Sequence, residues 1–229
     1  MHITPDHMIV CRWLWFTLNG TILYTWAVML LLTLVSWLIT RRLVYSDEPR
    51  SRWQNALEAI VEVIRGQIRE VCPVGGDTYL PFVGTLFLYI AVSNVLHILP
   101  YWHSPTGSLS TTAALAISVG VAVPVFGIRS QGLAGYIRHY IRPSVIMLPF
   151  HLLSETTRNV ALAVRLFGNI MSEAMIVGVL LAIAPLFVPI VLQVLGLLTG
   201  MIQAYIFSIL AMVYIAAAVQ SQQQRKGAG

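Results

Sequence analysis

The side chains best suited to chemistry lie in one long apolar segment of the C-terminal half, residues 144–184. Projected as a helix at about 100° per residue, they share an arc of about 100° that only Leu162 interrupts. The arc extends about 33 Å along the helix axis, which is close to the thickness of a bilayer's hydrocarbon core. Its polar members are His151, Ser154, Glu155, Arg158, Arg165, Asn169, Ser172 and Glu173.

Arg165 is the most informative of these residues, because a charge at the centre of a membrane helix costs about 2.5–3.5 kcal/mol on insertion scales. No acidic residue lies three or four positions from Arg165, so its counter-charge must come from another element. Glu155 and Arg158 stand three residues apart, and a structural ion pair explains them as well as a functional role does.

The last apolar segment, residues 190–220, carries a surface that could face this arc. Its residues at spacings of three and four are Gln193, Gly196, Gly200, Gln203 and Phe207. Small residues at such spacings allow two helices to approach closely, and packing is the more common meaning of this pattern. Gln203 adds an amide that could hydrogen-bond to a group near Arg165 or steer it.

The composition excludes an ordinary soluble domain, because 57% of the residues are hydrophobic and only 10% are charged, against about 25% in soluble domains. The net charge of +5 reflects arginines at the ends of apolar segments and predicts no nucleic-acid partner. Cys11 and Cys72 indicate neither a disulfide framework nor a metal site. The sequence shows no nucleotide-binding loop or nucleophile–base pair, so we expect no catalysis, metal or cofactor.

The gaps between charged residues predict an all-α polytopic membrane protein with a single membrane domain and five spans. The expected segments are an outer N-terminal segment (1–18, without a signal-peptide pattern), spans at 21–40, 79–99 and 109–128, an interfacial amphipathic helix (50–72), long helices at 144–184 and 190–220, and a cytoplasmic tail (221–229). A helix of about 40 residues is about 60 Å long and cannot stand upright in the membrane. We therefore expect the last two helices to be tilted.

The basic residues predict the orientation of the chain. The clusters within 41–69, 129–142 and 225–226 should face the cytoplasm. Five crossings then place the N-terminus outside and the C-terminus inside. We find no internal repeat, which disfavours a two-halved transporter. A stand-alone ion channel or secondary transporter is the second hypothesis, and a membrane scaffold is the third.

Two segments, AVRLFGNIMSE (163–173) and MIQAYIFSILAMVYIAAA (201–218), resemble the signature segments of the a subunit of F-type ATP synthases. The resemblance extends in the same order over roughly 200 residues, including NVLHILP (94–100). It implies a non-catalytic membrane subunit of a prokaryotic inner (plasma) membrane, with two long helices forming a hairpin against a rotating ring of c subunits. It also implies a peripheral stalk of b subunits, the remaining synthase subunits and the lipid bilayer as partners.

The resemblance assigns roles to individual residues. The family's characteristic Arg and Gln match Arg165 and Gln203, and two offset half-channels pass H⁺ or Na⁺ to and from the carboxylates of the ring. The residues we expect along the outer half-channel are Glu173, Asn169, Ser172, His97 and Ser108. The residues we expect along the inner half-channel are His151, Ser154, Glu155 and Arg158.

Four positions depart from the family's usual pattern. The outer acid or His commonly follows the Arg by nine residues, whereas Glu173 follows by eight, a change of about 100° on the helix. His151 stands where a Glu is common, fourteen residues before the Arg. Gly196 replaces an ionisable residue seven before the Gln, and Ser108 replaces an Asp. These departures suggest a divergent prokaryotic variant such as the second, N-type ATPase of some prokaryotes.

Overall fold

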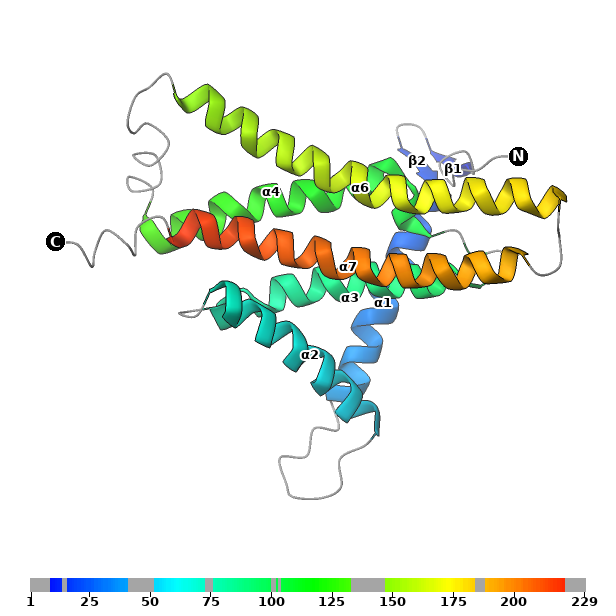
Figure 1. Cartoon of the computed structure of the whole chain (residues 1–229), viewed down its shortest axis with the longest axis horizontal. Coiled ribbons are helices and arrows are strands. Elements are labelled where there is room, and N and C mark those ends of the chain that lie inside the picture. Colours follow the sequence, from blue (N-terminus) through cyan, green and yellow to red (C-terminus); the bar gives the residue numbers. More distant parts are fainter. Residues whose placement is uncertain are drawn as a thin grey trace.

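The computed structural model describes residues 9–13, 16–40, 52–72, 76–99, 102, 104–132, 147–183 and 188–220. Within these ranges the chain forms six α-helices and one pair of β-strands (Figure 1). The helices are α1 (Gly20–Thr40), α2 (Arg52–Val71), α3 (Leu80–Leu96), α4 (Leu109–Gln131), α6 (Met147–Ile183) and α7 (Val188–Gln220). The predicted 144–184 and 190–220 helices are thus each continuous over their described parts. The predicted tail, 221–229, lies outside the described residues.

The N-terminal segment differs from the all-α prediction. Strands β1 (Ile9–Trp13) and β2 (Phe16–Asn19) pair antiparallel, with a register irregularity between Ile9 and Cys11. Their sequences, IVCRW and FTLN, are rich in the β-branched and aromatic residues that favour strands. Each strand has only four or five residues, which is too short for its pattern to predict a strand.

Four helices of the described ranges are long and apolar enough to cross a membrane, at Gly20–Leu38, Leu109–Ser130, Pro149–Leu181 and Pro189–Val219. The predicted span 79–99 is shorter than expected, because α3 has 17 residues and a length of about 26 Å. Its last residues form tight turns, in which the N–H of His97 donates to Asn94 (3.2 Å) and that of Leu99 to Leu96 (3.1 Å). Whether α3 is a fifth span therefore remains a prediction.

Helix α2 has the predicted amphipathic pattern, but few of its residues are covered. Ile64, Ile68 and the adjacent Cys72 are buried, whereas most other described side chains of α2 are exposed. The guanidiniums of Arg65 and Arg69 lie 3.5 and 3.4 Å from the carboxylate of Asp77, but these ion pairs are exposed and contribute little to stability. The position of α2 on a membrane surface stays a prediction.

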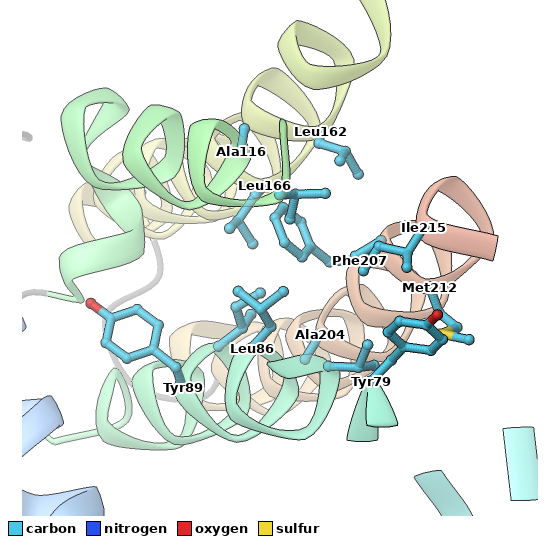
Figure 2. Packing of buried hydrophobic residues seen from close by; sticks show 14 of the residues in the cluster. Tyr79, Leu86, Tyr89, Ala116, Leu162, Leu166, Ala204, Phe207, Met212 and Ile215 are labelled. Carbon is cyan, nitrogen blue, oxygen red and sulfur yellow. The ribbon is translucent and has the colours of Figure 1, made fainter. Parts of the chain in front are cut away.

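Helices α3, α4, α6 and α7 form the core of the fold. Figure 2 shows Leu162 and Leu166 of α6, Ala116 of α4 and Leu86 of α3 gathered around Phe207 of α7. All five side chains are buried, and such burial is worth about 1.5–3 kcal/mol for each large apolar side chain. The packing fixes the rotation of α6 and α7 about their axes, and hence the direction of their polar residues.

The long helices α6 and α7 lie side by side over much of their length (Figure 1). Helix α6 has 37 residues and α7 has 33, or about 55 and 50 Å. Towards its N-terminal end α6 diverges from α4 and α7 in the view of Figure 1. Helix α1 runs obliquely to this bundle, and many of its large apolar side chains are exposed.

Candidate functional site

The polar arc of α6 lies along the border between its buried and exposed faces. Leu162, Leu166 and Ile170 are buried, and they define the side of α6 that faces the bundle. The arc residues nearest this side are half-buried: His151, Glu155, Asn169 and Glu173. Those on the far side of the arc are exposed: Ser154, Arg158, Arg165 and Ser172. The polar arc predicted from the sequence is therefore divided: one side of it faces the bundle, and the other side faces the surroundings.

Arg165 faces away from the bundle. Its side chain is exposed, and within the described residues its guanidinium forms no ion pair or hydrogen bond. Arginine stays protonated under any working condition, so this position carries a permanent positive charge. The prediction that its counter-charge does not come from its own helix agrees with this arrangement.

Gln203 of α7, in contrast to Arg165, is buried inside the bundle. Its side chain is only 8% exposed, and its buried Nε2 has no hydrogen-bond partner among the described residues. The same holds for the buried Nδ2 of Asn169 on α6. No hydrogen bond joins Gln203 to Arg165 in the described part of the chain. A buried amide donor without a protein partner costs about 1–3 kcal/mol, so water or another group should satisfy both amides.

A small cavity of about 10 Å³, close to the space that one water molecule needs, lies between α3, α6 and α7. Two of the five outer candidates, Glu173 and His97, line it. Asn94 and Gln193 add two amides that the sequence analysis did not propose for this site. The other three candidates, Asn169, Ser172 and Ser108, are not among its lining residues.

The carboxylate of Glu173 lies against the backbone of α7 at Gly196. A side-chain carbon added at Gly196 would overlap this carboxylate. The glycine therefore leaves the space that the acid occupies, and the acid reaches α7 although it belongs to α6. The two departures from the family pattern at positions 173 and 196 are thus one local arrangement.

Asn94 joins α3 to α7 at the same cavity. Its Nδ2 donates a buried hydrogen bond of 2.7 Å to the carbonyl oxygen of Gly200. A side-chain carbon added at Gly200 would lie 2.9 Å from this nitrogen, so the contact needs the glycine. The bond holds the cavity wall formed by α3 in register with α7.

Replacing Asn94 with leucine should destabilise the chain by about 0.6–1.7 kcal/mol, the range measured for hydrogen bonds between membrane helices. Thermal unfolding of the complex in detergent would measure the loss. Thr85→Val is the matched control, because the Thr85 hydroxyl bonds only within α3, to Pro81. Equal stability of the two variants would exclude a structural role for the Asn94 contact.

A larger cavity of about 240 Å³ lies between α4, α6 and α7, towards the N-terminal end of α6. All four predicted inner residues line it: His151, Ser154, Glu155 and Arg158. Its volume holds several water molecules. The rest of its wall is formed by Val123, Asn159, Tyr214, Ala217 and Ala218.

Arg158 contacts Tyr214 rather than an acid. Its guanidinium carbon lies 5.3 Å from the centre of the Tyr214 ring, within the range of a cation–π contact. Within the described residues Arg158 forms no ion pair, so the structural Glu155–Arg158 pair considered above is not formed.

Four polar residues line the two cavities but were not predicted as site residues from the sequence: Asn94, Gln193, Asn159 and Tyr214. Asn159 projects at about 80° from His151, just beyond the polar arc, and was excluded by that boundary. Asn94 stands three residues before His97, so both lie on one face of α3, and this spacing could have identified it. Tyr214 could not be identified from the sequence, because an aromatic residue in an apolar helix usually has only a packing role.

The fold and its two cavities define a multi-pass membrane protein with a fixed cation on α6 between two polar sites. A sequence model described as "ATP synthase A chain" matches residues 22–216. The ATP synthase subunit a 1 of Crocosphaera subtropica is 56% identical over 99% of this chain and 98% of its own length. That of Albidiferax ferrireducens, ATP synthase subunit a, is 54% identical over 100% of this chain and 99% of its own.

The chain therefore belongs to the ATP synthase subunit a family. It is a non-catalytic subunit of the membrane sector of an ATP synthase, the ion-translocating part of that complex. Its spanning helices and bacterial relatives make it a multi-pass inner membrane protein that associates with the rest of the synthase.

Proposed function

We propose that the chain conducts H⁺ or Na⁺ through two offset half-channels and passes these ions to and from carboxylates on a ring of c subunits. The observation that carries this proposal is Arg165, a permanent charge exposed on a membrane helix with no partner in the described chain. An exposed charge facing lipid would be costly. A carboxylate on a neighbouring subunit removes that cost.

The charge of Arg165 performs two tasks in this proposal. It attracts an ionised ring carboxylate as that carboxylate passes, which favours release of the ion it carried. It also repels cations that would cross directly from one half-channel to the other. Ions must then travel around on the ring, and this requirement couples ion flow to rotation. Arginine suits the task because it does not give up its proton, unlike a buried lysine.

The outer half-channel would use the small cavity at Glu173 and His97, with Asn94 and Gln193 as further polar groups. Asn169, Ser172 and Ser108 stay candidates for the same route. Gln203 stays a candidate for ion translocation, since its buried Nε2 has no hydrogen-bond partner among the described residues and could bind water. These assignments follow from proximity and polarity.

The inner half-channel would use the larger cavity at His151, Ser154, Glu155 and Arg158. Several water molecules there would carry ions between the ring and the water on the N-terminal side of α6. The basic residues at 129–142 and 225–226 support a cytoplasmic location for this side. This orientation places the N-terminus outside and the C-terminus in the cytoplasm, with α3 as a fifth crossing.

The partners that fit this function are a c-subunit ring on the Arg165 face and a b-subunit peripheral stalk elsewhere. The exposed apolar side chains of α1 offer a surface for the stalk or for lipid. The departures at positions 108, 151, 173 and 196 support a divergent variant such as the N-type ATPase.

A photocrosslinking experiment tests the Arg165 face. Ala161 lies one turn before Arg165 and is exposed. With Cys11 and Cys72 replaced by serine, a benzophenone maleimide on Ala161→Cys should crosslink to a small, multi-copy subunit in native membranes. Val125→Cys, on an exposed site of α4, is the matched control and should not. Crosslinks to lipid alone at Ala161→Cys would overturn the proposal.

A further inference from the structure

Helix α4 is continuous, but it lacks one of its backbone hydrogen bonds. Pro124 lies inside the helix and has no backbone N–H. The carbonyl of Gly120, four residues earlier, therefore lacks its usual helical donor. Gly120 also has no side chain to shield that carbonyl. Together the two residues create a polar notch in the wall of an otherwise apolar span.

The amide of Asn159 on α6 lies against the backbone of α4 at Gly120. A side-chain carbon added at Gly120 would overlap the Asn159 Nδ2 and lie 3.0 Å from its Cγ and 3.4 Å from its Oδ1. All three atoms of the amide are thus near the backbone of α4. Only glycine at position 120 permits this approach.

Asn159 also lines the 240 Å³ cavity of the inner site. Within the described residues its side chain forms no hydrogen bond, although an amide offers two donors and an acceptor. The adjacent Arg158 contacts Tyr214 on α7 instead. Consecutive residues of α6 therefore face different neighbouring helices, and the cavity lies where these helices diverge.

We propose that Asn159, positioned by the Gly120–Pro124 notch of α4, is a water-holding residue of the inner ion route. This inference rests on the proposed function, because it takes the larger cavity to be that route. The amide provides hydrogen bonds to cavity water on a wall that is apolar at Val123. Gly120 is the positioning residue, since a larger side chain would push the amide into the space that water occupies.

Two measurements on the assembled complex in vesicles test the proposal. One is passive ion conduction after removal of the soluble ATPase sector. The other is the rate at which a water-soluble maleimide labels Ser154→Cys in the cavity, with Cys11 and Cys72 replaced by serine. Gly120→Ala should lower both by about tenfold, the effect of losing a hydrogen bond or two.

Double variants separate the size of the Asn159 side chain from its polarity. In Gly120→Ala with Asn159→Ala, the overlap disappears but no amide remains, so labelling should recover while conduction stays low. In Gly120→Ala with Asn159→Ser, a short hydroxyl should restore part of both. Gly84→Ala is the matched control, because an added carbon there meets no atom within 4 Å, and it should change neither measurement.

The outcomes distinguish this inference from the proposed function. Normal labelling and conduction in Gly120→Ala would overturn the positioning role. If Gly120→Ala fails to assemble, Asn159→Ala alone decides, and normal conduction in that variant would overturn the role of the amide. A variant such as Asn159→Leu that loses labelling yet conducts normally would instead show that the cavity is not the ion route.

Discussion

Arg165→Ala should reduce ATP-driven ion pumping by at least about a hundredfold while the complex still assembles, because the variant removes the electrostatic barrier between the two proposed half-channels. Arg165 is exposed and forms no contact in the described chain, so its loss should leave the fold intact. Fluorescence quenching in inverted membrane vesicles measures pumping, and the subunits that co-purify report assembly.

The control for this variant is the neighbouring exposed residue. Val164→Ala shortens an uncharged side chain that is 55% exposed. It removes no charge and should therefore pump normally. Arg165→Lys tests the permanence of the charge, because a desolvated lysine can lose its proton. It should also pump poorly. Normal coupled pumping by Arg165→Ala would sink the proposed function.

Gly196→Ala should lower passive ion conduction by about tenfold or more, because the added carbon overlaps the Glu173 carboxylate and expels it from the outer cavity. The expelled acid would then face either lipid or the core, and both are costly for a charge. Conduction is measured in vesicles stripped of the soluble ATPase sector.

Gly178→Ala is the control, since an added carbon at Gly178 of α6 meets no atom within 4 Å and should not affect conduction. Combining Gly196→Ala with Glu173→Asp should recover part of the flow, because the shorter acid makes room for the new methyl group. Failure of Gly178→Ala to conduct would show that any glycine substitution is harmful. Normal conduction by Gly196→Ala would show that the position of Glu173 against α7 is not needed for ion conduction.

The helices could be predicted from the sequence because apolar runs between charged residues leave few alternatives in a membrane. The uninterrupted apolar runs 144–184 and 190–220 indicated both long helices, which the structure describes over Met147–Ile183 and Val188–Gln220. The end of α3 was placed three residues too late, since NVLHILP carries no charge to mark the end of the helix, whereas its backbone has already turned after Leu96. The β1–β2 pair was missed because each strand is four or five residues long.

The candidate site could be predicted only where one helix carries the pattern. Projection of α6 placed His151, Ser154, Glu155 and Arg158 in one polar arc with four other residues. The family resemblance assigned these four to the inner half-channel, and the structure places them around one cavity. The contacts between polar side chains and glycines of a neighbouring helix could not be predicted. They depend on how the two helices are rotated against each other. Gly196 was interpreted as packing for this reason, although its missing side chain makes room for Glu173.

The separation of the two cavities along α6 has a consequence for the membrane potential. Arg158 and Glu173 are about 22 Å apart along the helix axis, and Arg165 lies near the middle. If both cavities hold water and connect to opposite sides of the membrane, each takes the electrical potential of its own side, and the voltage falls mostly across the segment between them. In the proposed function, a ring carboxylate passing Arg165 would then cross the steepest part of the field, where 100 mV is worth about 2.3 kcal/mol per charge. The segment between the cavities would therefore let a modest voltage act directly at the point where the proposed ring is driven.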